Sequence, residues 1–276
     1  MGLSSNILWH QTNKDAFEKI LKARKLTLGY SREKFFDGSM ILAFPMVSLC
    51  DLPFSEMGDY LGKYGDYTIG FSREWGKKNA FTPVWYCETD SESEFQLKEM
   101  LSSNYRDAAL DILAYVKPVE GELETKEYVF DNYRYYDERE VRIVPINDVL
   151  RKYEIPRYLE SNEYEQYKKD HGGSPLIPLY ISFEWSDIKY LIVWRENQIE
   201  PLRKKLEKFG CDNHSIGIFS QNRIKHDFIG VAHNVGRKKK NIERAQKMRD
   251  MEATIKSQEE SRQQLKQSLE NILKQL

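Results

Sequence analysis

The stretch Tyr133-Arg-Tyr-Tyr-Asp-Glu-Arg-Glu-Val-Arg-Ile-Val-Pro145 joins a pair of acidic residues directly to a β-branched run. The run 141–144 has the alternation with a period of two that is typical of a strand. Glu138 and Glu140 are two residues apart, so on an extended backbone both side chains point to the same face. Neighbouring carboxylates repel each other, so such a pair either has a chemical function or is neutralised by basic partners. Both interpretations remain open, the second being a solvated strand end with ion pairs to nearby arginines.

Composition places limits on the protein class. The chain has 276 residues, 40% of them hydrophobic, which is enough for one sizeable core or one domain with an appendage. The formal net charge of -1 gives no general indication of a nucleic-acid or membrane partner. Cys50, Cys87 and Cys211 are far apart and form no C-x-x-C motif, which argues against a disulfide framework or a structural zinc site. We therefore expect no metal.

No run of about 18 apolar residues occurs, and the first residues lack the basic and apolar regions of a signal peptide. From this we expect a cytoplasmic protein that makes no membrane contact.

Hydrophobic periodicity predicts alternating strands and helices. Residues 7–12 predict a first strand, and Asn13 is a suitable N-cap for the helix that follows. Residues 91–116 have helical periodicity, and a further helix at 200–209 should end at Gly210. Polar residues 156–174 predict a loop. Further strands are expected at 26–31, 46–50, 67–71, 83–87, 179–183, 188–194 and 216–219.

The character of the sequence changes after Gly236. A basic block, Arg237-Lys-Lys-Lys240, precedes residues 241–276, which contain no Gly or Pro. Apolar residues in this last segment recur at steps of three and four, at Met248, Met251 and Ile255 and again at Leu265, Leu269, Ile272 and Leu276, while polar Gln258 and Arg262 occupy the two seam positions between them.

These features predict a domain over residues 1–220, a basic linker over 221–240 and a coiled-coil-type helix over 241–276. The helix would associate with a copy of itself, pair with a partner or fold back on the domain, although a solvated helix is an equally good interpretation. The basic block could contact nucleic-acid phosphates, or it could be a solvated linker.

Three short motifs follow predicted strands or flank them: His10-x-Thr12, Tyr30-Ser31 and Glu138-x-Glu140. With the opening Leu8-Trp-His-Gln-Thr12, this set resembles the ADP-ribosyltransferase domains of the His–Tyr/Ser–Glu kind, of which the DarT-type enzymes that modify DNA are examples. The resemblance implies an α+β domain with a mixed sheet, and NAD as the substrate that supplies ADP-ribose.

The resemblance also implies roles for the two acids. Cleavage of the nicotinamide–ribose bond builds positive charge on the ribose, as in glycoside hydrolysis. Glu140 would stabilise that charge and hold a sugar hydroxyl, while Glu138 would orient the acceptor or its nucleophile. Ion pairing of both acids with nearby arginines is the simpler interpretation.

The other motif residues would bind the cofactor. By the resemblance, His10 would contact the adenosine-side ribose or the pyrophosphate with support from Thr12, and Tyr30 or Ser31 would hold the nicotinamide half. Packing explains each residue equally well on its own, since His10 lies in an apolar run and tyrosines are abundant. Ser31-Arg32 also departs from the Ser-Thr-Ser pattern of arginine-type transferases.

A more extensive resemblance covers roughly residues 7 to 200. The chain is similar to the AbiGi family of abortive-infection, anti-phage proteins, usually described as the antitoxin half of a two-gene system. This resemblance implies a partner toxin encoded nearby, and it leaves open whether the chain is an enzyme or a regulator that keeps the fold without the reaction. The matching motifs are Met46-Val-Ser-Leu-Cys-Asp-Leu-Pro53, Lys63-Tyr-Gly-x-Tyr-x-Ile-Gly-Phe71, Glu74-Trp-Gly76, Pro83-Val-Trp-Tyr86, Glu138-Arg-Glu-Val-Arg-Ile-Val144 and Ser186-Asp-Ile-Lys-Tyr-Leu-Ile-Val193.

Overall fold

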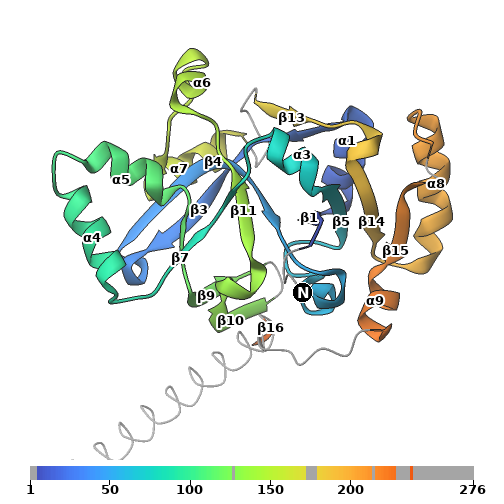
Figure 1. Ribbon diagram of the computed structural model, residues 1–276, viewed down its shortest axis with the longest axis horizontal. Helices are drawn as coiled ribbons and strands as arrows, with labels where there is room; N and C mark the ends of the chain where they lie inside the picture. The colour runs from blue at the N-terminus through green and yellow to red at the C-terminus, as the bar shows by residue number, and fades with distance from the viewer. Residues whose placement is uncertain (1–4, 126–127, 172–178, 213–214, 228–236, 239–276) are drawn as a thin grey trace, which may run out of the picture. The chain divides into compact units, whose positions relative to one another are not determined.

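A long central strand, β4 (Met40–Cys50), connects the two ends of the main sheet in a computed structural model of the protein (Figure 1). The structure describes residues 5–125, 128–171, 179–212, 215–227 and 237–238. It divides into two compact units, one formed by residues 1–121 and 132–234 and the other by 122–131 and 235–276. The predicted coiled-coil helix at 241–276 lies outside the described residues.

The main sheet has the order β15-β14-β5-β1-β4-β11-β6, and β3 and β12 also pair with β4. Only β14 and β15 pair in parallel among these strands, so the sheet is mixed and the predicted α+β class is confirmed. The strands besides β4 are β1 (Ile7–Thr12), β3 (Gly29–Phe35), β5 (Tyr67–Ser72), β6 (Thr82–Pro83), β11 (Glu140–Ile143), β12 (Leu159–Glu160), β14 (Ile188–Val193) and β15 (Gly217–Ser220).

The remaining described strands form smaller sheets. One pair is antiparallel, one pair is parallel, and one sheet has three strands. They are β2 (Lys25–Thr27) with β13 (Tyr180–Ser182), β7 (Trp85–Cys87) with β8 (Val116–Pro118), and β9 (Glu120–Glu124) with β10 (Tyr128–Arg134) and β16 (Arg237–Lys238).

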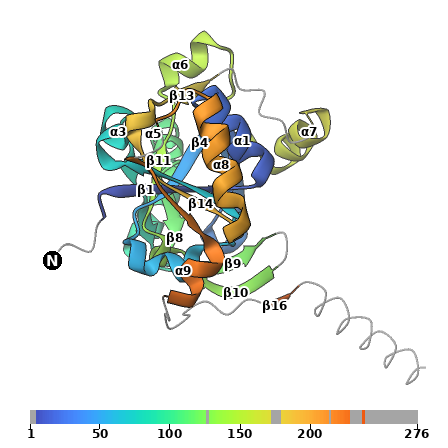
Figure 2. The same cartoon turned by 90° about the vertical axis from the view of Figure 1, so that its right-hand side faces the viewer.

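Helices cover both faces of the main sheet (Figures 1 and 2). They are α1 (Lys14–Ala23), α2 (Met57–Tyr60), α3 (Arg73–Lys78), α4 (Glu92–Leu101), α5 (Arg106–Leu113), α6 (Asn147–Lys152), α7 (Ser161–His171), α8 (Ile199–Lys208) and α9 (Gln221–Asp227). As predicted, the Asn13 side chain caps α1 by accepting from Ala16 N, and Gly210 follows α8 with a left-handed φ of 77°.

Two predicted segments differ in the structure. The periodic stretch 91–116 is broken into α4 and α5 by the polar run Ser102-Ser-Asn-Tyr105, whose short side chains compete for backbone hydrogen bonds. Residues 156–174, predicted to be a loop, contain helix α7. This helix has no buried residue, so its sequence shows no hydrophobic periodicity. Helix formation is favoured here by the high helix propensity of Glu, Gln and Lys and by the basic residues of the last turn.

Alternation along the strands separates two hydrophobic cores. On one face, strand residues such as Leu8, Leu49 and Ile69 pack with α1 and α8. On the other face, Trp9 and Cys50 pack with α2 and α9. Helix α9 therefore contributes to a core, although it begins the segment 221–240 that the sequence predicts to be a basic linker.

A third hydrophobic cluster lies where α4 and α5 cover β3 and the first half of β4, at the end of the sheet opposite α1 and α8 (Figure 1). In the described part of the chain, no helix is both long enough and apolar enough to cross a membrane.

Candidate functional site

The acidic pair of the quoted stretch lies at the start of β11. Glu138 ends a 3-10 turn, Tyr135–Glu138, and Arg139 has a left-handed φ of 45°. The sequence predicted an extended backbone across the pair. In the structure the backbone there is not extended, because the strand begins only at Glu140. Both carboxylates are nevertheless brought together, and they are 3% and 4% exposed.

Lys117, on β8, holds the two acids together. Its Nζ lies 2.8 Å from Oε2 of Glu140 and 3.5 Å from Oε2 of Glu138. The lysine side chain is buried with them, and its ammonium also lies 4.5 Å from the centre of the Tyr135 ring. A shared cation removes the repulsion that two adjacent carboxylates would otherwise suffer.

Arg142 binds the same acid from the other side. It is two residues from Glu140 on β11, so both side chains point to one face of the sheet. The guanidinium donates to Glu140 Oε1 at 2.7 Å, to Glu33 Oε1 on β3 at 2.8 Å and to the backbone oxygen of Ala114 at 2.8 Å. Arg142 is completely buried, and its donors connect three separate segments of the chain.

We call Glu33, Lys117, Glu138, Glu140 and Arg142 the buried charge cluster. Three acids face two cations, and the five residues come from β3, β8, the 3-10 turn and β11. Of the nearby arginines, Arg142 belongs to this cluster, and Arg134 pairs with Asp137 at 3.5 Å.

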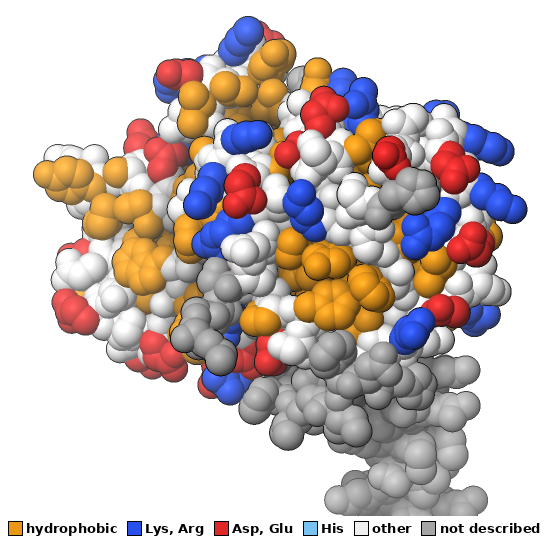
Figure 3. All heavy atoms as spheres, turned by 45° about the vertical axis from the view of Figure 1, so that its right-hand side comes forward, with side chains coloured by type: hydrophobic (Ala, Val, Ile, Leu, Met, Phe, Trp, Pro, Cys, Tyr) orange, Lys and Arg blue, Asp and Glu red, His pale blue; other side chains and the backbone are white. Residues whose placement is uncertain are grey.

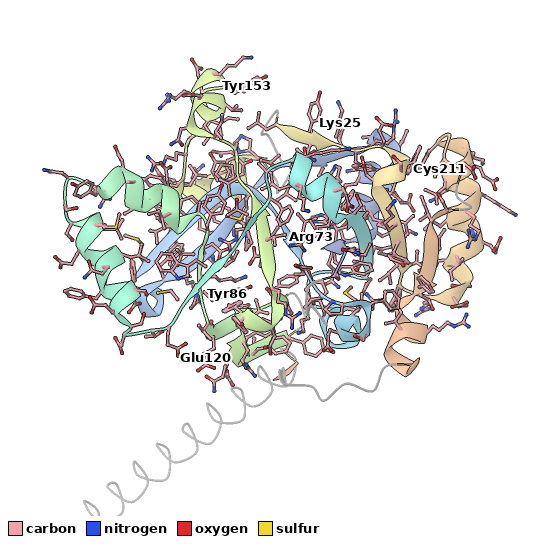
Figure 4. The ribbon with its side chains drawn as sticks, viewed as in Figure 1. Lys25, Arg73, Tyr86, Glu120, Tyr153 and Cys211 are labelled. Carbon is pink, nitrogen blue, oxygen red and sulfur yellow. The ribbon has the colours of Figure 1, made fainter. Side chains whose placement is uncertain are left out.

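Tyrosines complete the hydrogen bonding of the acids. Tyr64 and Tyr133 each donate to Oε1 of Glu138, at 2.5 and 2.7 Å. The hydroxyl of Tyr86, labelled in Figure 4, accepts the Glu140 backbone N–H at 2.7 Å. Every oxygen of the two carboxylates therefore has a donor within 3.5 Å.

The pKa shifts follow from these contacts. Burial alone would raise the pKa of Glu140, but Arg142 and Lys117 outweigh it and hold that pKa well below its usual range. Burial lowers the pKa of Lys117, yet Glu140, Glu138 and Glu33 raise it well above its usual value. Burial raises the pKa of Glu33, against the opposing effect of Arg142. At neutral pH, Glu140 and Lys117 are thus a fully charged pair.

His10 lies on the other face of the sheet from the acids. Trp9, Cys50 and Glu140 are direct partners across β1, β4 and β11, so their side chains share a face. His10 is the next residue on β1 and points to the opposite face, where its partner on β5 is the core residue Ile69. Its Nδ1 lies 3.2 Å from Ser48 O, and burial lowers its pKa despite that hydrogen bond.

The other predicted cofactor residues are also divided between the faces. Thr12 shares the face of His10, and Tyr30 packs against the same core while its hydroxyl donates to Pro156 O at 2.5 Å. Ser31 is two residues from Glu33 on β3, so it shares the face of the buried charge cluster. The structure therefore brings Glu138 and Glu140 together and places Ser31 on the same side of the sheet, opposite Phe44 of β4, whereas His10, Thr12 and Tyr30 lie on the other side.

Two members of the cluster were absent from the sequence prediction. Lys117 directly follows the stretch 91–116 predicted as helical, and Glu33 lies in a strand with no unusual local pattern. A solitary lysine before a proline carries no local sign of ion pairing, because its partners are 21 and 23 residues away. Among the described residues, no group of three His, Cys, Asp or Glu side chains could hold a metal ion.

A family model described as "Putative abortive phage resistance protein AbiGi, antitoxin" matches residues 25–194, more than half of the chain. The chain belongs to the AbiGi family. All five residues of the buried charge cluster fall within the matched range, whereas His10 and Thr12 precede it.

A relative described as "Abortive phage resistance protein AbiGi", from Lactococcus lactis subsp. cremoris, is 29% identical over 197 residues. The alignment covers 58% of this chain and 77% of the relative. No solved structure matches the chain significantly.

Proposed function

We propose that this protein is the non-enzymatic antitoxin of an abortive-infection system, which neutralises a partner toxin encoded nearby by binding it. The family description supplies the class of protein. The observation that carries the non-enzymatic part is that the oxygens of Glu138 and Glu140 are already bound to donors within the chain.

A carboxylate that stabilises a developing ribose cation must reach the sugar, and its oxygens must be free to hold a hydroxyl. Glu140 is 4% exposed, and Arg142 and Lys117 occupy both of its oxygens. Its contacts instead join β11 to β8, and through Arg142 to β3. The cluster then serves to fix three strands relative to one another, which keeps the surface of the fold in the form that a partner recognises.

NAD-dependent ADP-ribosyl transfer is the second candidate. It is favoured by the arrangement of Glu138, Glu140 and Ser31 on one sheet face, together with the resemblance of the opening motif. In that case Glu140 would remain the catalytic acid, but His10, Thr12 and Tyr30 would have to be replaced as cofactor ligands, since they belong to the other face.

Growth rescue separates the two candidates. The neighbouring open reading frame is expressed as the toxin, with the full chain or its Glu138→Gln variant supplied in trans. Glutamine keeps an oxygen for the Tyr64 and Tyr133 hydroxyls but removes the carboxylate. Asp148→Asn, on the exposed side of α6, is the matched control.

If the protein is an antitoxin, both variants should rescue growth as fully as the wild type, and the protein should release no nicotinamide from NAD. Loss of rescue in Glu138→Gln with an unchanged circular dichroism spectrum, accompanied by nicotinamide release from NAD by the wild-type protein, would reverse the choice. A neighbouring gene that resembles a nucleotidyltransferase would further favour the antitoxin.

A further inference from the structure

Helices α1 and α8 form one basic face of the protein. They pack on the same core through Phe17 and Leu21 of α1 and Leu202 and Leu206 of α8. The Lys205–Glu18 ion pair, at 2.7 Å, joins them, and the two helices lie side by side in Figure 2.

The charge of this face differs from that of the whole chain. Helix α1 carries three cations and two acids, a net +1, and helix α8 carries four cations and two acids, a net +2. The entire chain has a net charge of -1, so the rest of it is acidic. In Figure 3, which brings the α8 side forward, Lys and Arg side chains interspersed with acidic ones line the right-hand edge.

Several of these cations make no ion pair within the described chain. The two helices have four acids, which neutralise few of these cations. Glu18 pairs with Lys205, and Glu200 approaches Arg203 at 3.8 Å. In the described part of the chain, five exposed lysines of α1 and α8 have no carboxylate within 4.0 Å: Lys14, Lys19, Lys22, Lys204 and Lys208.

The face lacks the anchors that a protein partner would need. Protein interfaces are centred on buried aromatic and aliphatic side chains. Among the described residues, none of the exposed large hydrophobic side chains belongs to α1 or α8. Binding to a nucleic-acid backbone requires no such anchor, because cations that neutralise phosphates and release counterions supply most of the affinity.

The spacing of the lysines also suits a duplex. Lys14 and Lys22 are eight residues apart on α1, or roughly 12 Å along the helix axis. The major groove of B-form DNA is about 12 Å wide, so two such lysines reach the phosphates on its two sides. Lys204 extends the row onto the neighbouring helix.

We infer that the α1–α8 face binds the phosphate backbone of double-stranded DNA without reading its sequence. This activity is additional to the proposed neutralisation of a toxin and does not depend on it. The lysines act as point charges on phosphates, and the acids Asp15 and Glu207 between them limit the affinity.

Fluorescence anisotropy of a short mixed-sequence duplex tests the inference with the full chain. The test variant is Lys14→Glu/Lys22→Glu/Lys204→Glu. The control, Lys77→Glu/Lys78→Glu/Lys169→Glu, makes the same change of charge at exposed lysines of α3 and α7. Both variants retain the basic block 237–240, and circular dichroism confirms that each is folded.

The wild type should bind at low salt with an affinity that falls as salt rises. The test variant should lose at least about tenfold in affinity and reduce the slope of log K against log salt by about 2–3, while the control stays within about threefold of the wild type. An absence of wild-type binding at low salt, equal losses in the two variants, or binding to polyglutamate as tight as to the duplex would each overturn the inference.

Discussion

Arg142 and Glu140, two residues apart on β11, form an ion pair of 2.7 Å in the interior, where the arginine has no exposed surface. Removing two charges from water is costly, and the cost is recovered only when geometry is good and the remaining donors are also satisfied. Arg142 meets this condition through Glu33 and the carbonyl of Ala114. Such a pair contributes little net stability while it is intact, but breaking it leaves a charge stranded.

Arg142→Met should therefore destabilise the protein by about 3–5 kcal/mol, because Glu33 and Glu140 lose their common partner. Arg151→Met on α6 is the control; its side chain is 74% exposed, and the change should cost no more than about 0.5 kcal/mol. Urea unfolding followed by circular dichroism measures both. Adding Glu33→Gln to Arg142→Met should restore part of the loss, since one stranded acid becomes neutral. Equal losses in the two arginine variants would show that the cluster is not important for stability.

The depressed pKa of Glu140 gives the fold a defined acid sensitivity. Because its folded pKa lies below the unfolded value of 4.5, its contribution to stability is fully present above about pH 4.5 and is lost as pH falls further. The difference in unfolding free energy between the wild type and Glu140→Gln should thus be largest near pH 7 and shrink toward pH 3. Glu33, whose pKa is shifted in the opposite direction, is present in both proteins, but Glu140 contributes to that shift, so the measured difference includes a change at Glu33. Urea titrations across that range make the measurement, and a difference independent of pH would contradict the assignment.

His10, which is partly buried against the core, should stay neutral to a lower pH than an ordinary histidine. Burial lowers its pKa below 6.5, so its contribution to stability is present above that pH and is lost as pH falls through it. From about pH 7.5 to about pH 5.5, the wild type should lose more stability than His10→Gln does. His171→Gln is a matched control, because His171 also has its Nδ1 near a backbone oxygen, that of Tyr167, but lies on the surface helix α7. If His10→Gln and His171→Gln had the same dependence on pH, His10 would not be the buried titrating group.

Local patterns were sufficient for most of the fold. The β-branched run after Glu140 is strand β11, Asn13 caps α1, and Gly210 follows α8, because each of these signals acts within a few residues. The surface helix α7 was not found, since it buries no side chain and so has no hydrophobic period.

The site was harder to predict because its contacts are distant in sequence. Glu33 and Arg142 are 109 residues apart, and only the pairing of β3 and β11 with β4 brings them together. The face on which His10 lies is likewise set by its register against β4 and β5, where a shift of one residue would reverse it. The sequence predicted that nearby arginines, Arg142 among them, could neutralise the two acids, but it gave no sign that Lys117 is their other partner.

The C-terminal segment provides a final prediction, which rests on sequence because residues 241–276 lie outside the described part of the chain. Its apolar seam is too narrow to stabilise an isolated helix, so we expect the full chain to self-associate through it. Light scattering should give a mass at least twice that of a chain truncated after Gly236. Leu269→Asn, on the seam, should lower the mass of the full chain to that of the monomer, whereas Leu273→Asn, off the seam, should not. A full chain with the mass of a monomer would leave the segment as a solvated helix or a surface for a different partner.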